Sequence, residues 1–395
     1  MNDFIPKLDY ILHNHFWSFG LIVSFIIGSC VGSFLNVCIW RIPRGESVSH
    51  PPSHCPKCDY EIKPYENIPI IAWLMLKGQC KNCSLPISPR YIILEAFVGF
   101  LYVWVTYVFV QQDLPLGCLI FFYSMTAVFV TVSFIDIEHY RIPNQINLYA
   151  AITIIPVIIW APSFFTNNID MENVYRLMPS LKNSAAPLQA LCYSLVGAFT
   201  SFFILWALVY CGRLFKKEQT LQLDDALEVK ITESGIHSFE KGQWEECLWK
   251  DIALKKGETI NYQIEGNSLN LKSLSAEKII INAEQKVLIG EDSYSAGEEE
   301  ITFKAKSITF PIDVIGQGDL KYVLILGAFL GPQMGLLSIF IAAFFGSIIG
   351  MLQIIKSKKI SAAILPFGPF LSISAFLCLL YRAEIIELIS SLWNQ

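Results

Sequence analysis

The sequence predicts an all-α polytopic membrane protein of about eight transmembrane helices, with a small cysteine-containing domain and a β-rich soluble insert. Hydrophobic residues make up 53% of the 395 residues and charged residues only 16%, against about 25% charged in ordinary soluble domains. The charges are unevenly spread, because residues 213–315 hold 13 of the 29 Lys and Arg residues and 19 of the 34 Asp and Glu residues. The net charge of −5 gives no indication of a nucleic-acid partner.

Apolar runs define the predicted spans, because about 20 helical residues cross the roughly 30 Å hydrocarbon core of a bilayer. The runs are 17–40, 91–111, 115–135, 145–164, 186–212, 321–331, 334–355 and 362–381. The sixth and seventh come from one run that is too long for a single span. Gly331-Pro332-Gln333 interrupts it, since proline ends or kinks a helix, and the sixth span is short. The first 16 residues lack the features of a signal peptide, so we expect no cleavable leader.

Lys and Arg residues predict the orientation, because they concentrate in short cytoplasmic loops. With the N-terminus outside, the cytoplasmic segments 41–90, 136–144 and 356–361 carry 11 Lys and Arg residues. The opposite side carries only Lys7, Arg176, Lys182 and Arg382. The sequence therefore predicts that both termini lie outside and that segment 41–90 is cytoplasmic.

This plan divides the chain into five segments. They are the N-terminal segment with the first span (1–40), a small cytoplasmic domain (41–90), spans two to five (91–212), a polar cytoplasmic insert (213–315) and the last three spans (316–395). Apolar and polar residues alternate within the insert, as in short β-strands separated by polar turns. The runs that predict strands are 268–272, 279–282, 286–289 and 300–304.

Four of the 11 cysteines form two C-x-x-C pairs, Cys55 with Cys58 and Cys80 with Cys83. The 21 residues between the pairs slightly exceed the usual spacing in a four-thiolate zinc site. Two such turns place four thiolates about 2.3 Å from one tetrahedral zinc ion, which is structural because no position stays open for water. Cytoplasmic thiols stay reduced, which favours a small zinc-binding domain over the alternative of two redox or disulfide pairs.

Two carboxylates stand at the same predicted boundary of the membrane. Asp136 ends the third span and Asp319 opens the sixth. A single Asp at a helix end is often only a cap or a loop charge, but two facing carboxyl groups cannot easily both ionise, so one keeps its proton. Gly316 and Gly318 allow unusual backbone shapes and close approaches. Pro143 prevents the chain after Asp136 from continuing as an unbroken helix.

Such a pair is suited to peptide hydrolysis without a covalent intermediate. The ionised carboxyl takes a proton from water while the protonated one donates to the peptide carbonyl. The sequence contains no G-x-S-x-G turn and no H-E-x-x-H motif. Glu138 and His139 lie beside Asp136 and are interpreted as neighbours of the site rather than as its primary catalysts.

With these residues considered together, the chain resembles the bacterial type IV prepilin leader peptidases, which are membrane aspartic peptidases with a Gly-x-Gly-Asp motif. The resemblance implies that Asp136 and Asp319 are the catalytic pair and that Gly316, Gly318 and Lys321 support them. It rests on ordered motifs between residues 20 and 380: Gly32 to Val37 with Arg41-Ile42-Pro43, the four cysteines, Asn67-Ile68-Pro69, Trp73-Leu74, Ser88-Pro89-Arg90-Tyr91 with Glu95, Asp136 with Ile142-Pro143-Asn144, Gly316 to Asp319 with Lys321, and Pro366-Phe367-Gly368-Pro369-Phe370.

The resemblance also implies a substrate and a second reaction. The substrate would be a type IV pilin or pseudopilin precursor, cut at the cytoplasmic face of the bacterial inner membrane between a short basic leader and an apolar helix. S-adenosylmethionine would then methylate the new N-terminus. Gly78 matches a glycine linked to methylation in the family, whereas Gln79 stands where a basic residue is common. A peptidase without methylation therefore stays an alternative.

Two further alternatives stay open at this stage. One is a membrane scaffold or transporter with the same fold. Transporters place charges near the middle of their spans, whereas Asp136, Asp319 and Glu95 all lie near predicted span ends. The other concerns the insert, which is either a tolerated loop insertion, a docking module for a cytoplasmic partner, or a lid over the neighbouring site.

Overall fold

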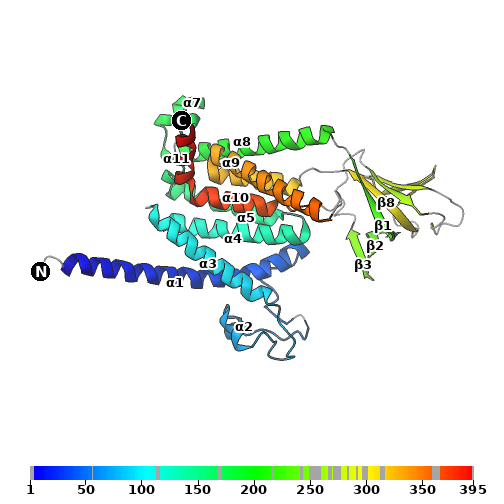
Figure 1. Ribbon diagram of the computed structural model, residues 1–395, viewed down its shortest axis with the longest axis horizontal. Coiled ribbons are helices and arrows are strands. Elements are labelled where there is room, and N and C mark those ends of the chain that lie inside the picture. The colour runs from blue at the N-terminus through cyan, green and yellow to red at the C-terminus, as the bar shows by residue number, and fades with distance from the viewer. Residues whose placement is uncertain are drawn as a thin grey trace. The chain divides into compact units, whose positions relative to one another are not determined.

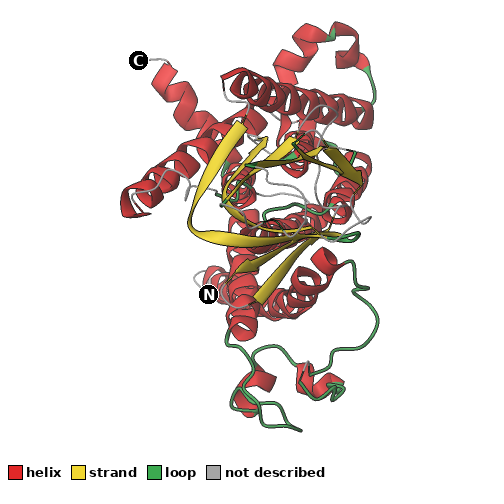
Figure 2. Cartoon of the chain, turned by 90° about the vertical axis from the view of Figure 1, so that its right-hand side faces the viewer, coloured by secondary structure: helices red, strands yellow, loops and turns green. Residues whose placement is uncertain are grey.

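The computed structural model describes residues 4–393 except for 56, 113–115, 167–170, 216–217, 241–242, 249–258, 266–268, 270–276, 283, 291, 296–300, 312–315 and 358–364. The chain forms two compact units. One unit comprises Met1–Trp206 with Ile315–Gln395 and is helical, and the other comprises Ala207–Val314 and is built on an antiparallel sheet (Figures 1 and 2).

The apolar runs of the sequence form helices, as expected for segments whose backbone groups find no water in a bilayer. The helices are α1 (Phe4–Arg41), α2 (Ile71–Met75), α3 (Arg90–Gln111), α4 (Leu116–His139), α5 (Asn144–Trp160), α6 (Ser163–Thr166), α7 (Met171–Leu177), α8 (Ala186–Phe215), α9 (Gln317–Ser357), α10 (Gly368–Leu380) and α11 (Arg382–Trp393). In Figure 1, α1, α4, α8 and α10 run in similar directions along the long axis.

The described residues contain five helices long and apolar enough to cross a membrane, or six if the bent pair Gly368–Leu380 and Arg382–Leu388 is one span. The chain is therefore a multi-pass membrane protein. The sequence predicts eight spans, and the difference has two structural reasons. Helix α5 has only 17 residues, and α9 contains both the sixth and the seventh predicted spans.

Helix α9 is interrupted at the predicted break, where Gly331 has non-helical angles (φ 77°, ψ −179°). Residues from both halves of α9 lie beside the start of α10. In the first half, the Tyr322 hydroxyl is 2.8 Å from the Ser372 hydroxyl. In the second half, a Cβ on Gly350 would lie 3.1 Å from the Leu365 side chain. The chain thus reverses its direction near Gly331.

Helices α1 and α3 pack closely because glycines remove side chains from their contact. A Cβ on Gly28 would lie 2.8 Å from the Val98 carbonyl oxygen, and one on Gly32 would lie 2.9 Å from the Glu95 Cα. Small residues allow this approach in membrane helix pairs. The contact fixes α1 against the segment of α3 that carries Glu95.

The predicted β-rich insert is present as one sheet with strand order β3-β2-β1-β8-β4-β5-β6-β7, in which all neighbours are antiparallel. Glu218, the first residue of β1, pairs with Pro311, the last residue of β8. One face is buried around Ile279, Ile281 and Phe303, as alternating sequence predicts. The strand expected at 268–272 lies outside the described residues except for Leu269. The strands are β1 (Glu218–Ile231), β2 (Gly235–Glu240), β3 (Gln243–Leu248), β4 (Thr259–Ile264), β5 (Lys278–Asn282), β6 (Lys286–Ile289), β7 (Asp292–Ser295) and β8 (Ile301–Pro311).

Candidate functional site

Asp136 lies in the last turn of α4 and is 4% exposed. Its Oδ2 accepts a hydrogen bond of 2.7 Å from the backbone N–H of Gly368, the first residue of α10. Free N–H groups at a helix start favour a negative charge. A Cβ on Gly368 would lie 2.8 Å from the same oxygen, so only glycine leaves room for this carboxyl group.

Asp319 lies in the first turn of α9, where its Oδ2 accepts a hydrogen bond of 3.2 Å from the Gly316 N–H. Its Oδ1 is buried and has no hydrogen-bond partner among the described residues. A buried carboxylate oxygen without a hydrogen bond is costly unless a bound molecule supplies one.

Two contacts hold the start of α9 against the loop that follows Asp136. A Cβ on Gly318 would lie 3.1 Å from the Ile142 carbonyl oxygen, so the absence of a side chain lets the two backbones meet. The Lys321 Nζ donates a hydrogen bond of 2.8 Å to Asn144 Oδ1 at the start of α5. Gly316 thus contacts Asp319 directly, and Gly318 and Lys321 contact the loop after Asp136 from the same helix start.

The structure brings together the two carboxyl groups that 183 residues separate in the sequence. Asp136 and Asp319 lie close enough for their charges to interact, and both also act electrostatically on the buried Tyr322 hydroxyl. Two carboxyl groups in a poorly solvated site at the end of a span are suited to transferring protons to and from a bound peptide.

The other charged groups beside Asp136 have different surroundings. Glu138 forms an ion pair with Arg90, at the start of α3. His139 Nε2 is buried without a hydrogen-bond partner among the described residues. Arg141 donates to the Pro43 carbonyl oxygen. These contacts join the end of α4 to the ends of α1 and α3, and they leave Glu138 committed to Arg90.

The four cysteines form a second site in the segment between α1 and α3. Their sulfur atoms lie within 4.8 Å of one another. The two C-x-x-C turns have the same backbone pattern. Cys55 N–H donates to Tyr60 O at 2.9 Å and Cys80 N–H to Leu85 O at 2.8 Å. The residue after each second cysteine, Asp59 or Ser84, has positive φ.

This geometry fits one tetrahedral metal ion. Four sulfurs at about 2.3 Å from zinc lie about 3.8 Å apart, and the Cys55–Cys83 and Cys58–Cys80 sulfur pairs are 3.9 and 4.0 Å apart. A disulfide needs about 2.05 Å, and all four cysteines are free in the structure, so neither these pairs nor the two C-x-x-C pairs are disulfides. Backbone N–H groups of Cys83 and Asn82 lower the pKa of the Cys80 thiol to about 7, which favours the thiolate that a metal binds.

Gly78 lies next to this cluster, with a φ of 67° that other residues rarely adopt. A Cβ there would lie 2.7 Å from the Trp73 ring. The Trp73 indole N–H in turn donates to the Ile87 carbonyl oxygen at 3.3 Å. Gly78 therefore supports the packing of the cysteine domain.

Sequence reasoning did not single out Gly368 or Asn144 as parts of the site. Both belong to motifs that only the resemblance connects with the site. The one available signal for Gly368 is its position before Pro369, because proline is favoured in the first turn of a helix and a glycine there exposes the free N–H groups. No local pattern indicates that this helix start meets Asp136.

Two segments of the chain match models of known protein families. Residues 26–109 match a family model described as the bacterial peptidase A24 N-terminal domain. Residues 284–351 match the type IV leader peptidase family. The four cysteines lie in the first match and Asp319 in the second, whereas Asp136 lies between them.

Similar curated proteins carry related names. The chain is 36% identical over 137 residues to the prepilin leader peptidase/N-methyltransferase of Myxococcus xanthus. It is 33% identical over 141 residues to the type 4 prepilin-like proteins leader peptide-processing enzyme of Escherichia coli. It is 29% identical over 213 residues to the prepilin leader peptidase/N-methyltransferase of Neisseria gonorrhoeae.

These matches cover 35%, 31% and 48% of this chain, and 40%, 51% and 65% of the three relatives. The chain thus spans about half the length of the curated relatives it matches. No solved structure matches it. Two models of one peptidase group thus match in order along a multi-pass membrane chain, over residues 26–109 and 284–351.

Proposed function

We propose that this protein is a membrane aspartic endopeptidase that removes the leader from type IV pilin or pseudopilin precursors, with Asp136 and Asp319 as the catalytic pair. One observation carries the proposal. Two carboxyl groups from distant parts of the sequence meet at the end of a span, and one buried oxygen of Asp319 has no partner among the described residues. The names of the relatives supply the substrate class.

The proposed reaction uses one water molecule and one proton shared by the pair. One carboxylate takes a proton from the water as its oxygen attacks the scissile carbonyl carbon. The other carboxyl group donates its proton to the carbonyl oxygen, as in aspartic peptidases. The tetrahedral intermediate then collapses, the C–N bond breaks, and a carboxyl group returns a proton to the leaving amine. The products are a leader with a free carboxyl end and a mature protein with a free amine.

The position of the site suits a substrate that is embedded in the bilayer. Asp136 lies three residues before the end of the candidate span Gly117–His139, near a membrane boundary. We propose that α5 and the two halves of α9 also cross the bilayer, which gives eight spans. The reversal at Gly331 supports this, because both ends of α9 then lie on the same side. The excess of Lys and Arg in short loops supports a cytoplasmic active site in the inner membrane and external termini.

We also propose that the protein methylates the new N-terminus with S-adenosylmethionine. The support is the bifunctional name of several relatives. The structure suggests how Gly78 contributes. Because its missing side chain leaves room for the Trp73 ring, we propose that Gly78 acts through the fold of the cysteine domain. Methylation without this domain is not expected.

For the cysteine domain we propose one structural zinc ion on Cys55, Cys58, Cys80 and Cys83. The sulfur separations and the matched backbone turns support zinc over two disulfides. When bound, zinc would fix the two turns to each other and would leave no coordination position for water. The domain is small, and such domains commonly need a metal to fold.

The test is cleavage of a prepilin-like precursor by the purified full chain in membranes. Mass spectrometry of the product reports the cut position and any added methyl group. We expect the wild type to cut, and Asp136→Ala and Asp319→Ala to be inserted but inactive. Glu138→Gln serves as the matched control, because Glu138 is paired with Arg90, and should retain cleavage. Failure of the wild type on several precursors would favour a scaffold, and cutting by either Asp variant would refute the assigned pair.

A further inference from the structure

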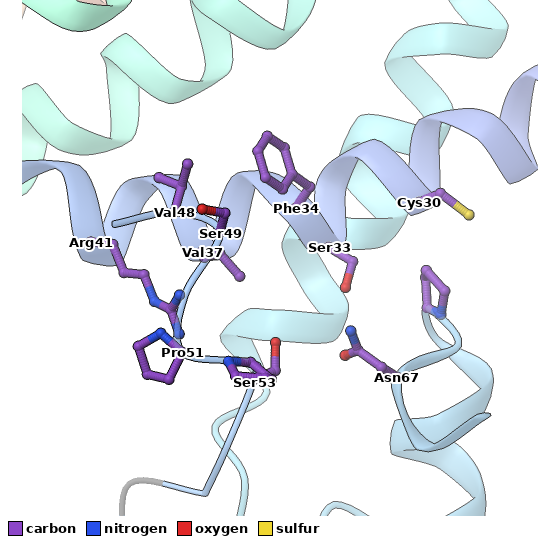
Figure 3. A pocket seen from close by; sticks show the side chains of 12 residues that line it. Cys30, Ser33, Phe34, Val37, Arg41, Val48, Ser49, Pro51, Ser53 and Asn67 are labelled. Atoms are coloured by element: carbon purple, nitrogen blue, oxygen red, sulfur yellow. The ribbon is translucent and has the colours of Figure 1, made fainter. Parts of the chain in front are cut away.

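A hollow of about 360 Å³ lies between the second half of α1 and the loops of the cysteine domain. The α1 wall is formed by Cys30, Ser33, Phe34, Val37 and Arg41, which share one helix face. The loops around residues 48–53 and 67–69 form the facing wall, with Ser53 and Asn67 among its polar side chains. Figure 3 shows the side chains of Arg41, Ser53 and Asn67 around this space. Its size falls within the range of small-molecule sites.

Arg41 is the charged residue of the lining and lies at one end of its α1 wall, whereas Ser33 is a polar residue deeper in the span. Arg41 stands at the end of the helix, is 8% exposed, and uses one guanidinium nitrogen to bind the Ser47 carbonyl oxygen at 3.0 Å. A guanidinium has five N–H donors, which leaves others for an anion. Val37 lies about one turn and Phe34 about two turns further into the span. The hollow therefore presents a cation at the membrane boundary and an apolar wall toward the bilayer interior.

A hydrogen bond fixes the loop that precedes α2 at a defined position along α3. The Ile70 N–H donates to Glu95 Oε2 at 2.7 Å, and the Ser33 hydroxyl binds the same carboxylate. Glu95 lies five residues inside the candidate span Arg90–Gln111, which is about 7 Å along a helix. The headgroup layer on each side of a bilayer is about 5–8 Å thick. With the membrane boundary placed at the start of this candidate span, the backbone at Ile70 lies at the level of the headgroups or just below them.

At this depth the loop and α2 present apolar side chains without protein partners. Ile68, Ile71, Leu74 and Met75 are 45%, 53%, 57% and 77% exposed. The last three occupy one face of α2, since residues three and four apart are neighbours on a helix. The opposite face carries Trp73, which is fixed to the cysteine domain. A contiguous exposed apolar patch of this kind marks a membrane or protein contact.

We propose that the hollow and this apolar patch together hold a phospholipid of the leaflet on the active-site side, with an anionic headgroup phosphate on Arg41. The acyl chains would follow Phe34 and Val37, and the α2 face would enter the same leaflet. The depth set by Glu95 favours lipid over a soluble partner. Lys77 follows α2 and adds a second positive charge near the headgroups, where each is attractive to anionic lipid.

The first arm of the test replaces Met75 by a photoreactive amino acid. The full chain is reconstituted in nanodiscs of phosphatidylcholine and phosphatidylglycerol, and we expect the probe to crosslink phospholipid. A probe at Glu61, an exposed polar position of the same domain, is the control and should label little lipid. Absence of lipid on the Met75 probe would overturn the proposal.

The second arm measures retained phosphatidylglycerol by native mass spectrometry. Arg41→Gln should retain it about fivefold more weakly than the wild type, the effect of losing one basic residue at an anionic surface. Lys278→Gln removes an exposed charge from the sheet and is the control. Val37→Trp fills the hollow without changing the charge and should also lose the lipid. This second variant keeps the proposal testable if Arg41→Gln does not fold. Equal retention by Arg41→Gln and Lys278→Gln, or displacement of the lipid by S-adenosylmethionine, would overturn the proposal.

Discussion

Gly368→Ala is expected to impair the site without altering either carboxylate. The new Cβ would lie 2.8 Å from Asp136 Oδ2, and ordinary contact begins near 3.4 Å. The carboxyl group must therefore retreat by about 0.6 Å from the N–H that now binds it at 2.7 Å. Hydrogen bonds to charged groups contribute about 1.5–3 kcal/mol, which corresponds to roughly a 10–150-fold change in rate. We expect kcat to fall by about one to two orders of magnitude, in line with small displacements of catalytic groups.

The assay compares cleavage of one precursor by the wild type, Gly368→Ala and the control Gly346→Ala in proteoliposomes with equal amounts of inserted protein. A Cβ on Gly346 would lie 3.7 Å from the Phe370 ring, which is an ordinary contact. The control is expected to cut at the wild-type rate, since alanine is a better helix former than glycine. A wild-type rate for Gly368→Ala would refute the packing of Asp136 against the start of α10.

Three further predictions concern the contacts around the site. Lys321→Met removes the hydrogen bond to Asn144 and should slow cleavage by about tenfold; a rate unchanged from the wild type would show that this contact does not position Asp319. Cys58→Ser or chelation should release one zinc per chain and expose the cysteine domain to protease while the spans stay resistant, and metal content equal to the wild type would exclude the proposed ion. Replacing 218–311 by a short Gly-Ser linker should leave an inserted, cleaving protein, because Glu218 and Pro311 are paired neighbours; loss of cleavage in a well-inserted deletion would favour the lid over the tolerated insertion.

The helical part of the fold is largely predictable because the bilayer demands long apolar helices. The break at Gly331 is visible as a glycine and a proline inside an apolar run that is too long for one span. The reversal that follows is not visible, since it depends on contacts of Tyr322 with Ser372 and of Gly350 with Leu365. Helix α5 ends at Trp160, before the predicted limit of its run at residue 164.

The two acidic residues of the candidate site can be predicted from the sequence, but the residues that contact and position them cannot. Asp136 and Asp319 stand out because carboxylates at membrane depth are rare. The cysteine cluster stands out because C-x-x-C spacing reflects the geometry of a turn around a metal. Gly368, Ile142 and Asn144 cannot be recognised in this way, because their role is to contact residues that are distant in sequence. Their part in the site follows only from the packing of α9 and α10 against the end of α4.

The central claim is that the two carboxyl groups act as one unit. The most direct measurement compares single-turnover cleavage rates of Asp136→Asn, Asp319→Asn and the double variant, with insertion of each confirmed by protease protection. We expect each single variant to lose at least about 10³-fold and the double variant to lose no more than either, because groups that act together are not additive. Substantial cleavage by one single variant, or a double variant whose loss is the product of the two, would contradict the claim.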